Sequence, residues 1–258
     1  MKISFASTSQ TGSRDSNQDL TGSLSGEHRA CFLVCDGVAG LPGGDKAALI
    51  VRDRLLSELS EDRHFSPQET RVAVEKCERS IREAQQINPK YSRMSTTLAA
   101  LFIDRSHQLA WWAHAGDSRI YHFRRGYIHQ VTRDHSLAQQ MKDAGYENTG
   151  INSNLLYNAL GAEVARDASY SDVLELEDGD AFLVCTDGFW LSLSAQEMEQ
   201  ALRMVNSPEE WLALMQNAIN RSSKSDNLSA VAVWMGSPQE TTLLQSLADS
   251  ARFLPPRD

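Results

Sequence analysis

"CFLVCDGVAG" (residues 31–40) is an apolar run of strand length that ends in Asp-Gly, and "AFLVCTDGFW" (residues 181–190) repeats this pattern later in the chain. An Asp at the end of a strand sits on a rigid element at the rim of a sheet. The Gly that follows it allows a sharp turn and a close approach of the backbone to a ligand. The two segments therefore predict core strands that carry Asp36 and Asp187 to the rim of a sheet.

Other short apolar runs indicate a chain rich in strands. Besides residues 30–35 and 181–185, they cover residues 3–7, 97–103, 109–115, 119–123, 127–131 and 228–234. The links DRSHQ (104–108) and RRG (124–126) are short enough for antiparallel hairpins.

Four segments carry the signals of a helix start. Each has an N-cap Ser and a Glu three residues later, and in three of them Pro follows the Ser. They are SPQE (66–69), SPEE (207–210), SPQE (237–240) and, without the Pro, SAQE (194–197). Residues at helical spacing after the first of them predict a buried face of Val72, Cys77, Ile81 and Ala84. Another helix is expected after Gly43-Gly44. Because the strand blocks alternate with helix pairs and not with single crossover helices, the sequence predicts an α+β fold of antiparallel sheets covered by helices.

Composition excludes several classes of protein. The chain has 258 residues and a net charge of −9, with no basic stripe, so we expect no nucleic-acid partner. No apolar run reaches the roughly 18 residues of a membrane span, and the N-terminus turns polar too early for a signal peptide. The four cysteines form no Cys-x-x-Cys pair, which favours buried thiols in a reducing cytoplasm. We expect one domain over residues 1–236 and a short helix with a loose tail over residues 237–258.

Five aspartates stand next to predicted strands or in turns between them. Asp36 and Asp187 end the two quoted runs, Asp117 follows AWWAHAG, Asp226 precedes the last strand, and Asp19 ends RDSNQD. Clustered carboxylates repel one another unless a cation sits among them, and an all-oxygen ligand set suits Mg²⁺ or Mn²⁺. Asp-Gly is also a common turn dipeptide, so the pattern alone supports a metal site and ordinary loops about equally.

Other catalytic motifs are weaker. The chain contains no G-x-S-x-G, no G-x-x-x-x-G-K-[ST] and no H-E-x-x-H. The glycines at 40, 43 and 44 could bring a helix N-terminus near an anion or form an ordinary connection. His135 in TRDHS is expected to be a structural hydrogen-bonding residue in preference to a proton-transfer group.

The order of the motifs resembles the metal-dependent type-2C Ser/Thr protein phosphatases, in particular their stand-alone bacterial members. The matching segments are RDSNQD, DGVAG, MSTT, AHAGDSRIY, TRDHS, ALG, CTDG and SDN, in family order from about Thr11 to Val233. Each segment alone is weakly specific, but eight in order are highly specific. The resemblance implies a sandwich of two antiparallel β-sheets flanked by helix pairs, a four-layer α-β-β-α arrangement, with a metal centre in a cleft at one end.

The resemblance also implies a ligand set. Asp36 is expected to bridge two Mn²⁺ or Mg²⁺ ions, and the carbonyl of Gly37 to bind one of them. Asp187 and Asp226 are expected to hold the other ion. Asp117 matches a position that helps to hold a weaker third metal in bacterial relatives.

The expected mechanism is direct hydrolysis. Two divalent ions lower the pKa of a bridging water, and the resulting hydroxide attacks phosphorus in line with the leaving oxygen. By resemblance, Arg14 grips the substrate phosphate and Asp19 orients the metal-bound waters. No phosphoenzyme forms, so no Cys or Ser nucleophile is expected.

Some positions depart from the family pattern. Gln18 stands where some relatives have Glu, and Ser95 stands where Gly is common. Val38 replaces a His that can act as a general acid in some relatives. Residues 137–158, which correspond to the variable flap, are a few residues short and lack the usual basic residue.

The leading hypothesis is a cytoplasmic, monomeric phosphatase that acts on phosphoserine and phosphothreonine in proteins and opposes a bacterial Ser/Thr kinase. Two alternatives remain: a pseudophosphatase that uses the same fold as a binding module, and another two-metal phosphoester hydrolase such as a nuclease.

Overall fold

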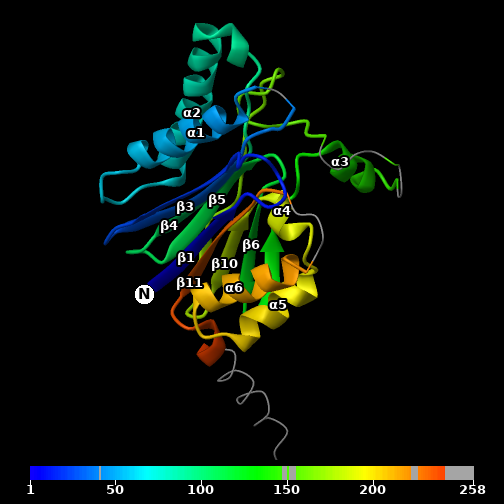
Figure 1. Ribbon diagram of the computed structural model, residues 1–258. Coiled ribbons are helices and arrows are strands. Elements are labelled where there is room, and N and C mark those ends of the chain that lie inside the picture. The colour runs from blue at the N-terminus through cyan, green and yellow to red at the C-terminus, as the bar shows by residue number, and fades with distance from the viewer. Residues whose placement is uncertain (41, 147–149, 151–154, 222–225, 242–258) are drawn as a thin grey trace, which may run out of the picture.

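The protein is a four-layer sandwich in which two β-sheets pack face to face and each carries a pair of helices on its outer face (Figure 1). The computed structural model describes all residues except 41, 147–149, 151–154, 222–225 and 242–258. This architecture confirms the α-β-β-α fold that the motifs implied.

One sheet has five strands, in the order β1-β11-β10-β6-β7, and all of its neighbouring strands are antiparallel. Its strands are β1 (Ile3–Gln10), β6 (Arg119–Arg124), β7 (Tyr127–Val131), β10 (Ala181–Cys185) and β11 (Leu228–Met235). The RRG link closes the expected hairpin between β6 and β7.

The other sheet has the order β2-β3-β4-β5-β8, and it is also antiparallel; the short β9 pairs with β5 as well. Its strands are β2 (Asp19–Ser25), β3 (Arg29–Asp36), β4 (Leu98–Asp104), β5 (Leu109–Ala115), β8 (Ser169–Tyr170) and β9 (Leu174–Glu175). DRSHQ closes the second expected hairpin, between β4 and β5.

Two-sided burial explains why the opening segment is apolar at every position. Successive side chains of a strand point to opposite faces of the sheet. In β3, Phe32 and Val34 pack between the sheets, and Cys31 and Leu33 pack under the helices. All four are at most 1% exposed.

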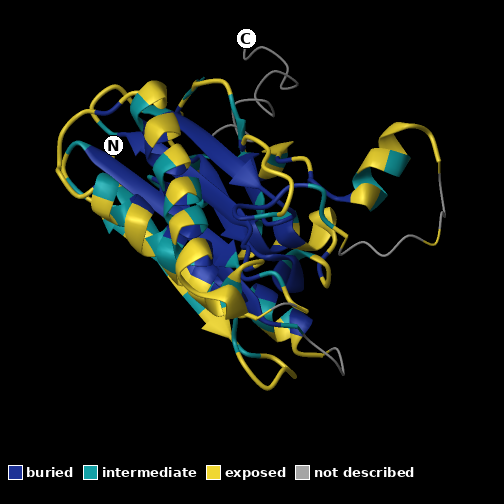
Figure 2. Cartoon of the chain, turned by 90° about the horizontal axis from the view of Figure 1, so that it is seen from above, coloured by how far each residue is buried: buried dark blue, intermediate teal, exposed yellow. Residues whose placement is uncertain are grey.

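The helices cover the outer faces of the sheets. Helices α1 (Gly44–Glu58) and α2 (Pro67–Ile87) pack on the six-stranded sheet, and α5 (Ala195–Met204) and α6 (Pro208–Ile219) pack on the five-stranded one. Seen from above, the strands are mostly buried and the helices beside them are exposed on their outer faces (Figure 2). Shorter helices are η1 (Pro89–Tyr91), α3 (Leu137–Asp143) and α4 (Asp187–Trp190). The predicted N-caps Ser66, Ser194 and Ser207 each accept a hydrogen bond from the backbone N–H three residues on.

Several details differ from the expectation. The edge strand β2 and the short strands β8 and β9 were not predicted, and β1 runs three residues further than expected, to Gln10. Val72 was expected on the buried face of α2 but is 39% exposed, because Ala73 and Val74 occupy that face. The expected C-terminal helix begins at residue 238 and is described as far as residue 241; the rest of the segment that was expected to form the helix and tail lies outside the described residues.

Helices in the described part of the chain lack the combined length and apolar character that a bilayer span requires. All four cysteines are buried free thiols.

Candidate metal centre

A cleft of about 320 Å³ opens where β3 and β10 end, at one rim of both sheets. Its lining includes six of the seven residues that the motifs singled out: Arg14, Asp36, Gly37, Asp117, Asp187 and Asp226. The seventh, Asp19, is buried beside it, opposite Asp36 in the register of β2 and β3. Residues that are up to 212 positions apart in the sequence therefore meet at one site.

The MSTT segment holds the end of β3 in place. The backbone N–H of Asp36 donates to Oγ1 of Thr97 at 3.0 Å, and the hydroxyl of Thr96 donates to the carbonyl of Asp36, also at 3.0 Å. The Thr97 hydroxyl lies 2.6 Å from that of Ser118, which follows Asp117. These contacts link the positions of two of the cleft carboxylates.

The two Asp-Gly pairs need glycine because another backbone segment passes close to each. A Cβ at Gly37 would lie 2.3 Å from the carbonyl carbon of Gly44, at the start of α1. A Cβ at Gly188 would lie 2.0 Å from the carbonyl oxygen of Asn227. The sequence reading attributed the glycines to a turn near a ligand, but the structure shows close chain packing behind the cleft.

The cleft concentrates acidic groups that cannot all ionise without a counter-charge. Burial, followed by the charges of Asp19 and Asp187, raises the pKa of Asp36 well above its usual range. Burial and the charge of Asp226 raise the pKa of Asp187. Burial is also the main cause that raises the pKa of Asp117 to about 7 and that of Asp19 to about 6.

These groups fit hard divalent cations. The donors are carboxylate and carbonyl oxygens, without His or Cys, as Mg²⁺ and Mn²⁺ prefer. Oδ2 of Asp19 accepts a hydrogen bond from the Thr186 hydroxyl at 2.8 Å, but its buried Oδ1 has no partner in the protein. A buried carboxylate with one free oxygen indicates a site built for a positive group or its water shell.

Arg14 is the cation at the mouth of the cleft. Its Nη2 lies 2.6 Å from Oδ2 of Asp226, and its side chain is 54% exposed. Asn227 anchors the loop that carries it: the side-chain amide donates to the carbonyls of Thr11 and Ser16 and accepts from the backbone N–H of Gln18. Asn227 belongs to the SDN motif, but the sequence alone indicated no role for it.

A network behind Asp117 positions that residue, and the sequence reading did not identify its members. Arg119 makes two 2.7 Å hydrogen bonds to the carboxylate of Asp134 and stacks 3.3 Å from the ring centre of Trp190. The indole N–H of Trp190 donates to the carbonyl of Asp117 at 2.9 Å. Asp117 thus sits on a turn that is fixed from two sides.

His135 has a structural role, as expected. Its Nδ1 accepts from the backbone N–H of Gly116 at 3.3 Å, and its Nε2 lies 2.9 Å from the hydroxyl of Ser169. Its ring stacks on His114, and burial lowers its pKa to about 4. A neutral, doubly hydrogen-bonded imidazole next to Gly116 supports the Asp117 turn.

Burial removes the cysteines as candidate nucleophiles. It raises the pKa of all four thiols, so none supplies a thiolate near neutral pH. They are Cys31, Cys35, Cys77 and Cys185. Val38 lines the cleft at the position where some relatives have His, and it brings no proton donor.

The fold, the acidic cleft and the order of the motifs define a class of metal-dependent phosphoester hydrolase. The family model of protein phosphatase 2C matches residues 7–232, and the chain belongs to that family. This confirms the class of enzyme that the motifs predicted, a metal-dependent protein serine/threonine phosphatase.

Individual relatives agree with this assignment. The chain is 26% identical over 255 residues to the serine/threonine phosphatase stp of Listeria welshimeri, an alignment that covers 92% of this chain and 95% of that protein. The structure of the S. agalactiae serine/threonine phosphatase superposes with a TM-score of 0.80 at 25% identity, covering 91% of this chain and 100% of that one. The catalytic domain of PstP, solved in complex with two manganese ions, superposes with a TM-score of 0.77 at 26% identity, covering 91% and 98%.

Proposed function

We propose that this protein hydrolyses phosphoserine and phosphothreonine in proteins at the Asp36–Asp187 cleft, with two divalent ions, Mn²⁺ or Mg²⁺, held by Asp36, the carbonyl of Gly37, Asp187 and Asp226. The observation that carries the proposal is that Asp36 and Asp187, whose pKa values burial and neighbouring carboxylates raise, share one cleft with Asp226 and Gly37. When bound, the ions supply Lewis acidity and lower the pKa of water between them. The protein's part is to hold the carboxylates in place and to bind the phosphate.

Arg14 is assigned to the substrate phosphate. Its guanidinium is always charged, reaches the cleft and is half exposed, so a phosphate can approach it. Its ion pair with Asp226 holds the guanidinium beside the metal-ligand carboxylates. When Asp226 is engaged by a metal ion, the donors of Arg14 can turn to the phosphate oxygens.

Asp117 and Asp19 are assigned supporting roles. Asp117 is proposed to share a weaker third ion with Asp187, and the charge of Asp187 contributes to the raised pKa of Asp117. Val38 has no proton to donate, so the proton for the serine or threonine leaving group is assigned to Asp117 or to water that it holds. Asp19 is proposed to orient water beside Asp36 through its unpartnered Oδ1.

The test is release of phosphate from a phosphothreonine peptide, measured against Mn²⁺ concentration, for the wild type and for Asp187→Ala. We expect the variant to fold and to lose several orders of magnitude in kcat, and chelation to abolish wild-type activity. Circular dichroism confirms folding, and Asp172→Ala, at an exposed position, is the matched control.

Near-normal turnover by folded Asp187→Ala, or full activity after exhaustive chelation, would contradict the dinuclear proposal. A folded wild type that binds the phosphopeptide without releasing phosphate would indicate the pseudophosphatase. Nicking of DNA without phosphate release would indicate the other two-metal hydrolase. The opposing kinase, the monomeric state and the cytoplasmic location stay predictions from the sequence.

A further inference from the structure

Three histidines and one aspartate gather at the end of the sandwich opposite the cleft. Asp104 is the last residue of β4, and His107 lies in the β4–β5 turn. His64 comes from the connection between α1 and α2, and His28 from the β2–β3 turn. Seven residues of β3 separate this end, at Arg29, from Asp36, which is about 23 Å at ~3.3 Å per residue. The cluster is therefore separate from the proposed metal centre.

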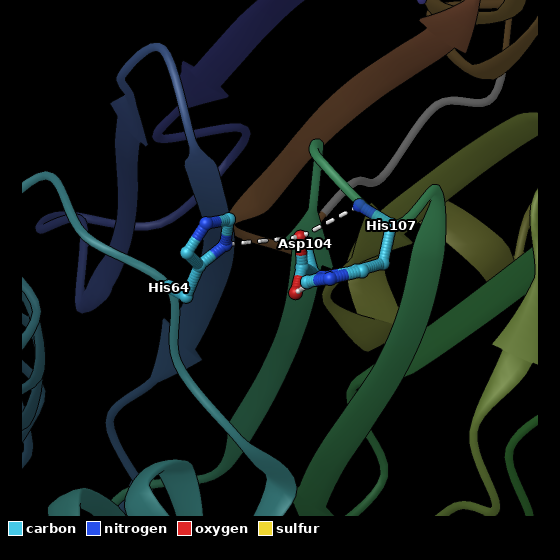
Figure 3. A group of neighbouring side chains, drawn as sticks. All are labelled: His64, Asp104 and His107. Carbon is cyan, nitrogen blue, oxygen red and sulfur yellow. Dashed lines mark hydrogen bonds and ion pairs between the residues drawn. The ribbon is translucent and has the colours of Figure 1, made fainter.

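The Asp104 carboxylate lies between two imidazoles (Figure 3). Its Oδ2 is 2.8 Å from Nδ1 of His107, and its Oδ1 is 3.8 Å from Nδ1 of His64. One ligand atom from each of the three residues lies within 4.8 Å of the other two. Among the described residues, it is the one group of three or more His, Cys, Asp or Glu residues whose ligand atoms all lie within 4.8 Å of one another.

The protein holds this arrangement without help from a metal. Oδ1 of Asp104 accepts the backbone N–H groups of Ser106 and His107, both at 3.0 Å, and Oδ2 is left to face the ring of His107. Asp62, two residues before His64, accepts the backbone N–H of His28 at 3.0 Å. The connection that carries His64 is thus tied to the turn that carries His28.

The spacing of the rings suits a shared ion. The ring centres of His28 and His64 lie 5.2 Å apart, and those of His64 and His107 lie 5.1 Å apart, with planes tilted by 44° and 49°. Two imidazoles bound to one tetrahedral zinc ion, at about 2.0–2.1 Å per bond, have ring centres about 5 Å apart. His28 packs beside His64, but its Nδ1 faces the hydroxyl of Ser106 at 3.3 Å, and its ring is not among the ligand groups that converge within 4.8 Å.

Acidic side chains outnumber basic ones around the cluster. The charged side chains around the cluster are the acids Asp104, Asp62, Glu61 and Glu69 and the bases Arg29, Arg63 and Arg105. Arg63 is already paired with Glu61 and Glu69. The side chains of His64 and His107 are 54% and 63% exposed, so an ion can enter from solvent.

We propose that His64, Asp104 and His107 bind one zinc-class transition-metal ion at this end of the sandwich. Imidazole nitrogens suit Zn²⁺, Co²⁺, Ni²⁺ and Cu²⁺, whereas the all-oxygen cleft suits Mg²⁺ and Mn²⁺. The ion joins the α1–α2 connection to the end of β4 and to the β4–β5 turn, and so fastens the helix pair to its sheet. The site is independent of the catalytic proposal.

The test compares Zn²⁺ titrations of the wild type and of the His64→Ala/His107→Ala double variant by calorimetry. Any zinc that enters the catalytic cleft does so equally in both proteins, so the difference isolates this site. We expect the double variant to bind one equivalent fewer, and each single variant to weaken the site at least about 10-fold. His129→Ala, which removes an exposed histidine on β7, is the matched control and should bind like the wild type.

Two further readouts support the comparison. Co²⁺ should give the visible absorption of a tetrahedral site in the wild type and lose it in the double variant. Hydrolysis of p-nitrophenyl phosphate with Mn²⁺ should be unchanged by the double substitution. Equal numbers of zinc equivalents in the wild type and the double variant, or an equal loss in His129→Ala, would overturn the proposal. A wild-type affinity for this ion no tighter than millimolar would overturn it too.

Discussion

Replacing Asp117 by Asn should stabilise the metal-free protein at high pH and have much less effect at low pH. Asp117 is only 6% exposed, and burial together with the charge of Asp187 raises its pKa from 3.8 to about 7. Asn has nearly the same shape and carries no charge at any pH. The variant therefore removes the cost of ionising this carboxylate inside the cleft.

The sign follows from proton binding. Between pH 4 and pH 7 the folded state holds the Asp117 proton and the unfolded state does not, so stability falls as pH rises through this window. The full difference between the two pKa values corresponds to about 4 kcal/mol, at about 1.36 kcal/mol per pKa unit. The gain from Asp117→Asn should grow by about 2–3 kcal/mol between pH 5 and pH 8. For a domain of this size that is roughly 5–10 °C in Tm.

The assay is thermal and denaturant unfolding in excess chelator at pH 5 and pH 8, for the wild type, Asp117→Asn and the exposed control Asp172→Asn. The control should shift stability equally at both pH values. Added Mn²⁺ at pH 8 should stabilise the wild type and reduce the advantage of Asp117→Asn. A stability gain of the same size at pH 5 and pH 8 would refute the argument, because it would mean that the carboxylate does not keep its proton on folding.

Two further predictions concern catalysis. Arg14→Ala should weaken inhibition by inorganic phosphate about 10- to 100-fold, which is the contribution of charge-assisted hydrogen bonds. The affinity for Mn²⁺ should stay unchanged or become slightly tighter, because Asp226 loses a competing partner. Calorimetric Mn²⁺ titration and phosphate inhibition measure these effects, and a large loss of Mn²⁺ affinity with unchanged inhibition would count against the assignment. Asp117→Ala should slow hydrolysis of a phosphothreonine peptide far more than hydrolysis of p-nitrophenyl phosphate, because only the alkoxide leaving group needs a proton. The loss of kcat on the peptide should reach about 10²- to 10⁴-fold. Equal losses of kcat on both substrates would show that the proton comes from elsewhere.

Local patterns were sufficient where the relevant contacts are local. The N-caps at Ser66, Ser194 and Ser207 were predictable because each joins residues three apart. β3 and β10 were predictable because burial on both faces leaves a continuous apolar run. β2 was missed because its partly exposed sequence DLTGSLS carries no such run, and only pairing with β3 makes it a strand.

The sequence by itself determined the residue types of the site and, through eight motifs in order, the family to which the chain belongs. Only the tertiary structure decided which of these residues share an environment. Three features of the site depend on segments that are distant in the chain. They are the raised pKa of Asp36, the support of the Asp117 turn by Arg119 and Trp190, and the close approach of the Gly44 backbone that requires glycine at position 37. The same is true of the histidine cluster: Asp104 and His107 are neighbours in sequence, but His64 joins them only because the α1–α2 connection folds over the end of β4. Burial and electrostatic coupling arise from distances in space, and those distances are set when the helices and sheets pack.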